Sequence, residues 1–131
     1  MKNVILILVM TCFAHMSMSQ KDGDVPFEKE FFKENKAEFK EAKKWLQEGL
    51  ALVDVPEGFY PNYKAAIPLL KRAYAFNPKS ADLCYKLGIC EINSSYKFDA
   101  LHFFQEAYHL KPNVDRMIHY YIGFAKQLHY A

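Results

Sequence analysis

The sequence predicts an all-α protein, a solenoid of helix–turn–helix units. The stretch from Ala66 to Pro78 returns 34 residues later, from Ala100 to Pro112, with large apolar residues at equivalent places. A fixed period of this length is typical of stacked supersecondary units. Glycine and proline contribute only 5 and 6 of the 131 residues, whereas 51% are hydrophobic, and this composition favours a helical globular body.

The unit from Ala81 to Pro112 is the most regular copy. The small residues Gly88, Ala100 and Ala107 lie where two antiparallel helices must approach closely. Pro112 ends the second helix because it has no backbone N–H to donate. The unit resembles the tetratricopeptide (TPR) repeat at six of eight signature positions. The matching residues are Leu87, Gly88, Ala100, Phe104, Ala107 and Pro112. Cys84 and Glu91 stand where the family has Trp and Tyr, and the resemblance implies a TPR solenoid.

The unit before it is a distorted copy. Trp45 precedes Gly49 by the spacing found in TPR repeats, but Glu48 replaces the expected Leu. Five extra residues fall between its two helices, in the turn-rich stretch 55–62. Pro68 lies inside the predicted second helix, where it removes one backbone hydrogen bond.

A third unit begins but lacks its second helix. Residues 118–128 repeat the first-helix pattern with Gly123 at the expected place, and the sequence ends at Ala131. The predicted TPR domain therefore covers residues 42–131, with repeats at about 42–80 and 81–114 and a partial repeat at 115–131. Because roughly three repeats are needed for stability, we expect either a fragment of a longer protein or a last helix that serves as a cap.

The first 19 residues predict a secretory signal peptide. Lys2 precedes an apolar run from Val4 to Met10, and small residues lead to a cleavage site after Ser19. An uncleaved anchor is the alternative, although the apolar run is short for a membrane span. Cys12 leaves a lipoprotein open, because Leu8 to Cys12 loosely resembles a lipobox. We therefore expect export to the periplasm or to the periplasmic face of the outer membrane.

Only two cysteines, Cys84 and Cys90, remain after that cleavage. They lie six positions apart on one predicted helix, a rise of roughly 9 Å, which is beyond the reach of a disulfide. We expect them to be buried small hydrophobic residues. Export without a disulfide framework favours a bacterial envelope protein over a small animal secreted domain.

Residues 20–41 form a predicted lead-in segment that contains an amphipathic helix. Asp24 is a candidate N-cap for this helix, and Pro26 fits its first turn. Phe27, Phe31 and Phe39 lie near one face, which we expect to cover the open end of the first repeat. A membrane-surface helix is disfavoured because the lysines and glutamates of the segment roughly cancel.

The sequence carries no pattern typical of an enzyme. His102 and His109 are seven positions apart, and the chain after the signal has no His-x-x-x-His pair, Cys-x-x-Cys pair or glycine-rich phosphate loop. The formal net charge is +2 and no basic stripe is apparent, which speaks against nucleic acid as a partner. We expect no catalysis, cofactor, metal or small-molecule substrate.

The TPR resemblance implies a concave binding surface lined by the first helix of each unit. By position, these residues form an apolar and aromatic groove that can bury a partner segment. The candidate groove residues are Leu46, Leu50, Tyr85, Ile89, Asn93, Tyr120 and Phe124. Leu46 and Leu50 stand where carboxylate-clamping TPR domains have Lys and Asn, so that clamp is not expected. The expected partner is a protein or peptide segment; the alternative is a surface covered by further repeats or a following domain of the same protein.

A narrower resemblance rests on four short runs. They are Asn77-Pro78, Tyr85 to Gly88, Asn93 to Lys97 and Ile118 to Gly123. These runs look like the N-terminal TPR region of a Bacteroidota envelope family. In that family, PD40-type propeller repeats and an OmpA-like peptidoglycan-binding domain follow the TPR region. Some members of the family belong to the type IX secretion machinery. The resemblance implies a scaffold for protein–protein interaction in the bacterial envelope, as the N-terminal part of a larger outer-membrane protein. The open alternatives are a structural spacer without its own ligand and a lipid-anchored TPR lipoprotein.

Overall fold

The fold is all-α, as the sequence predicts. The computed structural model describes residues 23–95 and 97–131, so the predicted signal peptide and Cys12 lie outside the described residues. The described residues form five α-helices and two short 3₁₀ turns, and no β-strand. The helices are α2 (Lys36–Val53), α3 (Tyr63–Phe76), α4 (Ala81–Ile92), α5 (Ala100–Leu110) and α6 (Ile118–Tyr130), and the 3₁₀ turns are η1 (Lys29–Phe31) and η2 (Lys97–Asp99).

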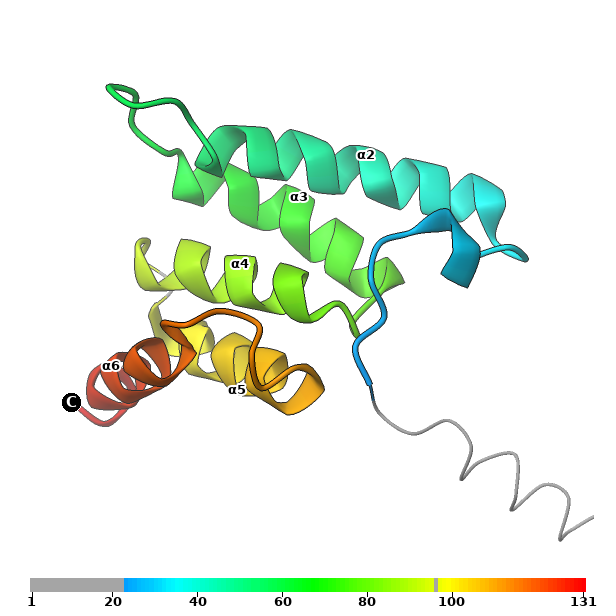
Figure 1. The fold of residues 1–131 in the computed structure, drawn as a ribbon. Helices are drawn as coiled ribbons and strands as arrows, with labels where there is room; N and C mark the ends of the chain where they lie inside the picture. Colours follow the sequence, from blue (N-terminus) through cyan, green and yellow to red (C-terminus); the bar gives the residue numbers. More distant parts are fainter. Residues whose placement is uncertain (1–22, 96) are drawn as a thin grey trace, which may run out of the picture.

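The helices form a stack in which each packs against the next one along the chain (Figure 1). Successive helices run in opposite directions, so α2 pairs with α3 and α4 pairs with α5 as two hairpins, with α6 following α5. One apolar cluster joins α2, α3, α4 and α5 and includes Leu70 and Leu87. A second cluster joins α4, α5 and α6 and includes Phe104 and Ile118. Because α4 and α5 contribute to both clusters, the two hairpins and α6 share a continuous core.

Glycines in the first helix of each hairpin let the second helix come close. A Cβ placed on Gly49 would lie 2.7 Å from Leu70 Cδ2, and one on Gly88 would lie 2.6 Å from Phe104 Cε1. Both separations are too short for a real side chain, so a larger residue would push the hairpin apart. Leu70 and Phe104 are themselves 34 positions apart. The sequence repeat therefore marks equivalent packing positions in two successive hairpins.

The connection between α2 and α3 is enlarged, as the sequence predicts. Residues 54–62 contain Gly58, whose φ of 91° is a left-handed conformation that favours glycine. The Asn62 side chain then accepts a hydrogen bond from Ala65 N–H at 3.1 Å and caps α3. Pro68 lies inside α3, where it leaves one backbone carbonyl without its helical donor.

The predicted helix of the lead-in segment is wrong. Residues 23–35 contain only the 3₁₀ turn η1, and the helix proper starts at Lys36. Asp24 does not cap a local helix: its Oδ1 accepts a hydrogen bond from Ala81 N–H, in the first turn of α4, at 2.9 Å. Val25 N–H also donates to Lys79 O at 2.8 Å. Pro26 disfavours a helical conformation at Val25, and the segment instead forms hydrogen bonds with the α3–α4 loop.

The lead-in segment still covers the open end of the first hairpin, but with a cluster of rings. The rings of Phe27, Phe32, Phe39 and Phe76 lie with centroids 5.0 to 6.4 Å apart. Phe31, which was expected on the covering face, is instead 56% exposed. The amphipathic pattern of this segment thus correctly predicts that its apolar side chains cover the end of the first hairpin, but it does not predict their conformation.

Helix α6 packs on α5 along one side and is open along the other. Ile118 and Ala125 are buried against the second cluster. No atom of the described residues lies within 4 Å of a Cβ placed on Gly123, in contrast to Gly49 and Gly88. Within residues 23–95 and 97–131, none of the helices combines the length and the hydrophobicity of a membrane span.

Candidate functional site

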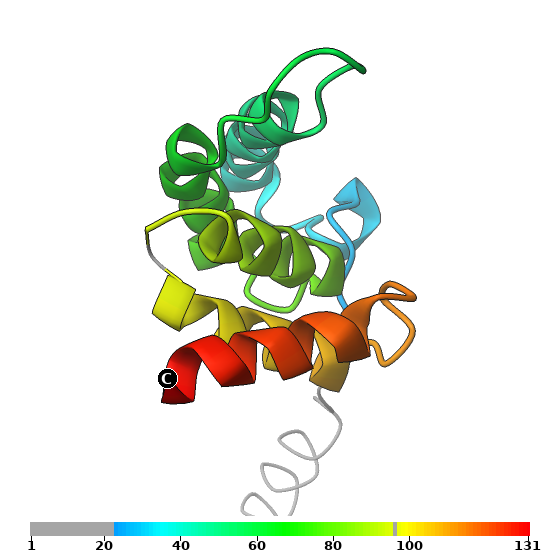
Figure 2. The ribbon, with the colours of Figure 1, turned by 90° about the vertical axis from the view of Figure 1, so that its left-hand side faces the viewer.

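A hollow of about 420 Å³ lies where four segments of the chain meet. The segments are the lead-in, α2, the N-terminal half of α4, and the loop between α5 and α6. Figure 2 shows the lead-in and the α5–α6 loop on the same side of the stack. The apolar lining includes Phe27, Leu46, Leu50, Leu83 and Val114, and the polar lining includes Asp82, Tyr85, Lys86 and Asp115. We call it the first-helix hollow.

Three of the seven predicted groove residues meet in the first-helix hollow. Leu46 and Leu50 reach it from α2, and Tyr85 reaches it from α4. All three are half-buried. Their spacing of four on α2 places both leucines on one face of that helix, next to the α4 tyrosine.

The other four predicted residues do not line this hollow. Ile89 is half-buried and packs against the second apolar cluster. The Asn93 side chain turns back on α4, where its Nδ2 donates to Ile89 O at 2.8 Å. Tyr120 and Phe124 stack on each other on α6 at 6.1 Å and are 59% and 39% exposed. The predicted groove is therefore divided into a lined hollow and a separate exposed aromatic pair.

Sequence reasoning missed the residues that complete the hollow from outside the first helices. Phe27 was placed in a lead-in helix, and its position beside Leu46 depends on the extended path of residues 24–27. Asp115 belongs to a loop, and no periodicity marks it. The contacts of the lead-in segment join residues that are far apart in the sequence, so a local sequence pattern cannot predict them.

Tyr85 is held in a fixed position within the hollow. Its ring meets Phe104 and Tyr121 edge to face, with centroids 5.8 and 6.0 Å apart. Burial raises the pKa of the Tyr85 phenol, and its hydrogen bond with the Asp115 carboxylate raises it further. Asp115 Oδ1 also accepts a hydrogen bond from Met117 N–H at 2.8 Å. Tyr85 therefore presents a rigid ring edge and not a free hydroxyl.

The charged groups at the rim are unevenly compensated. Lys86 forms an ion pair with Asp54, so its charge is largely neutralised. Asp82 forms no ion pair with any residue that the structure describes. The hollow therefore has a polar rim and an apolar floor. Ligand-binding sites in proteins commonly have this arrangement.

The two cysteines of α4 are buried and protonated. Cys84 and Cys90 are free and fully buried, and burial raises the pKa of each thiol to about 12. A thiol with such a pKa stays protonated near neutral pH and is unreactive. No group of three or more His, Cys, Asp or Glu side chains within residues 23–95 and 97–131 is arranged to hold a metal ion.

Comparisons of the chain with protein-family models, with curated protein sequences and with solved structures found no match. The internal repeat, the helix packing and the first-helix hollow are therefore the observations from which function is inferred.

Proposed function

We propose that this protein is an exported TPR scaffold that holds a segment of a partner protein against the first-helix hollow. The single observation that carries the proposal is that Leu46, Leu50 and Tyr85, which the TPR resemblance assigns to the binding groove, line one apolar hollow. Export is proposed from residues 1–19, whose charged start, apolar run and small-residue end are typical of a signal peptide. The setting would be the periplasm or the outer membrane of a bacterium.

The assignment to the TPR class is supported by the hairpin geometry. Two helix pairs, α2–α3 and α4–α5, stack in order, with Gly49 against Leu70 and Gly88 against Phe104. The second helix of each pair ends just before a proline, Pro78 or Pro112. These features agree with the signature positions by which the sequence resembles the repeat.

The mechanism is passive recognition by a preformed surface. The hollow needs no rearrangement to open, since Tyr85 is fixed by two rings and by Asp115. Its floor offers Leu46, Leu50 and Phe27 to an apolar side chain of the partner. Preorganisation of this kind reduces the entropy that binding would otherwise cost.

Site-specific photo-crosslinking tests the proposal. A photoreactive amino acid is placed at Leu46 or Asp82, which line the hollow, and at Gln105, an exposed residue of α5 that does not line it. We expect one common protein adduct in envelope extracts from the two hollow positions and none from Gln105. Equal adducts from all three positions would contradict specific binding, and no adduct from either hollow position would favour the structural-spacer alternative.

The mature N-terminus tests the route of attachment separately. Mass spectrometry of the protein purified from cells is expected to find Gln20 as the first residue. A lipid-modified Cys12 at the N-terminus would instead establish the lipoprotein alternative, and an intact Met1 would contradict cleavage.

A further inference from the structure

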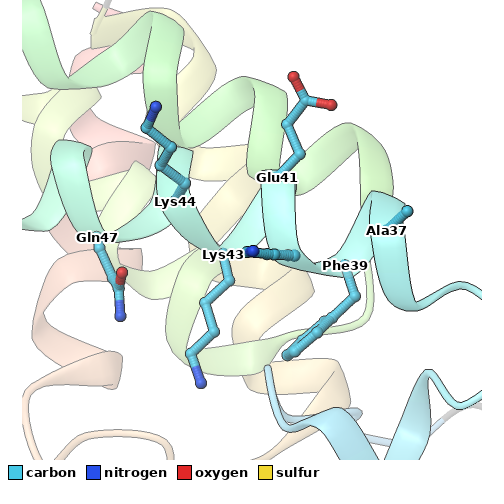
Figure 3. Close-up of a pocket in the computed structure, with 7 residues that line it drawn as sticks. Ala37, Phe39, Glu41, Lys43, Lys44 and Gln47 are labelled. Atoms are coloured by element: carbon cyan, nitrogen blue, oxygen red, sulfur yellow. The ribbon is translucent and has the colours of Figure 1, made fainter.

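Helix α2 separates its charges onto two sides. Lysines and glutamates of residues 28–48 nearly balance in the sequence. At 3.6 residues per turn, Lys36, Lys40 and Lys43 fall within about 60° of arc on the helix, whereas Glu38 and Glu41 fall well outside it. Figure 3 shows Lys43 and Glu41 pointing to opposite sides of α2. Lys36, Lys40 and Lys43 therefore share one side of α2, although lysines and glutamates balance in the sequence of this stretch.

Two hollows meet along this lysine side. One, of about 540 Å³, is lined by Phe39, Lys40 and Lys43, among others (Figure 3). The other, of about 550 Å³, is lined by Phe32, Phe39, Glu30 and three lysines from η1, its following loop and the start of α2. Phe39 lines both. We call Lys29, Lys33, Lys36, Lys40 and Lys43 the lysine stripe.

The floor of these hollows is aromatic and recessed. The rings of Phe32 and Phe39 stack with centroids 5.2 Å apart and planes inclined by 13°. Phe39 is only 7% exposed. The Lys43 ammonium lies 5.5 Å from the centre of the Phe39 ring, over its face. Each hollow thus places three lysines and one glutamate around an apolar base, with Glu41 at the first hollow and Glu30 at the second.

Lysines outnumber glutamates along the two hollows, which are lined by six lysines and by Glu30 and Glu41. Lys44, at its edge, pairs with Glu48 at 4.0 Å. None of the five lysines of the stripe has a carboxylate within ion-pair distance among the residues that the structure describes. Like charges at neighbouring helix positions repel each other. An anionic partner would relieve this repulsion.

We propose that the lysine stripe binds an acidic protein segment that carries apolar side chains between its carboxylates. The carboxylates would meet the lysines, and an apolar side chain would enter a hollow over Phe32 or Phe39. A recessed floor favours this partner over nucleic acid, because bases stack on exposed rings, and over a lipid surface, because bilayer insertion needs protruding apolar groups. The surface is separate from the first-helix hollow, so the two proposals succeed or fail independently.

Fluorescence anisotropy with labelled synthetic peptides tests this proposal. The probes are a short peptide that repeats Asp-Phe-Glu-Leu, one that repeats Asp-Ala-Glu-Ala, and one that repeats Lys-Phe-Arg-Leu. We expect the first to bind most tightly, the second more weakly, and the third not at all. The variant K33Q/K36Q/K40Q should weaken binding of the first peptide about tenfold, and added salt should also weaken it.

A matched control separates the stripe from overall charge. The variant K64Q/K97Q/K126Q removes three exposed lysines from α3, η2 and α6. It should bind the first peptide like the unmodified protein, and circular dichroism should show that both variants fold. An equal loss in the control, equal binding of the first two peptides, or no binding at all would overturn the proposal. So would stripe-dependent binding of phosphatidylglycerol vesicles or of a single-stranded oligonucleotide in the absence of peptide binding.

Discussion

Phe104 of α5 lies against Gly88 of α4 so closely that a Cβ on Gly88 would be 2.6 Å from Phe104 Cε1. The Phe104 ring is fully buried and also stacks on Tyr121 of α6, with centroids 5.2 Å apart. One glycine and one ring therefore determine how three successive helices approach each other.

Replacing Gly88 with Ala is expected to destabilise the protein. The new methyl group would displace the Phe104 ring, and overpacking of this kind costs about 1–3 kcal/mol, which exceeds the helix propensity gained over glycine. We expect the free energy of unfolding, measured by urea denaturation, to fall by about 1–2 kcal/mol.

The matched substitution is Gly123→Ala, in the equivalent position of α6. Nothing in the described residues lies within 4 Å of its Cβ, so the change should raise the free energy of unfolding by about 0.5–1 kcal/mol. Similar effects of the two substitutions would contradict the packing described for Gly88.

The contact between Asp24 and α4 should contribute measurably to stability. Asp24→Ala removes the acceptor for Ala81 N–H and a negative charge at the positive end of α4. We expect a loss of about 1 kcal/mol in the free energy of unfolding. Glu28→Ala, a nearby exposed position, serves as the control and should change little. Equal effects would mean that the lead-in does not cap α4.

Glu91 is a fully buried carboxylate whose charge is compensated by one lysine. Lys71 Nζ lies 3.2 Å from Glu91 Oε1, but neither carboxylate oxygen accepts a well-directed hydrogen bond from a described residue. Lys71→Met would leave this charge unpaired, and we expect the free energy of unfolding at neutral pH to fall by roughly 2 kcal/mol or more. The double variant with Glu91→Gln should recover most of that loss, and failure to do so would contradict the pairing.

The pH dependence of Glu91→Gln follows from the same burial. Burial raises the pKa of the Glu91 carboxyl, and Lys71 only partly offsets this. The unfolded chain therefore releases this proton at lower pH than the folded chain, so the stability of the unmodified protein declines as pH rises from about 4.3 through the raised pKa. Thermal melts should show the variant gaining stability relative to the unmodified protein across that range. A constant difference would be inconsistent with a raised pKa.

The two buried thiols should be inert in the folded protein. Since burial raises the pKa of Cys84 and Cys90 to about 12, almost no thiolate exists at pH 8. Iodoacetamide labelling followed by mass spectrometry should find both cysteines unmodified without denaturant and both modified in guanidinium. Rapid labelling of the folded protein would show that α4 opens locally.

The elements that the sequence predicts well are those that repeat. Gly88 and Phe104 were identified by their places in a periodic pattern, and both lie in the core where the pattern puts them. The enlarged loop before α3 was also predicted, because glycine and proline restrict the backbone locally. Helix packing with a fixed period needs the same residue types at the same spacing, which is why these features are visible in one sequence.

The path of the lead-in, which depends on distant contacts, was mispredicted. Asp24 and Pro26 have the composition of a helix start, yet Asp24 accepts its hydrogen bond from Ala81 N–H at the start of α4, 57 positions away. Tyr120 and Phe124 have the right repeat positions for the groove, yet they do not line the hollow around Tyr85. At Asp24 the local preference is worth about 1 kcal/mol, which the tertiary hydrogen bonds of residues 24 and 25 and the ring contacts of Phe27 exceed.

By itself, the sequence determined the helical class of this protein and the small residues between its paired helices, because helix periodicity and close packing act over short distances. Only the tertiary structure decided the path of the lead-in, the closure of the first-helix hollow by Phe27 and Asp115, and the gathering of five lysines into one stripe. These three features depend on which residues meet across the fold and on the side of the helix where each charged side chain lies. The numbers of lysines and glutamates in the sequence do not contain that information.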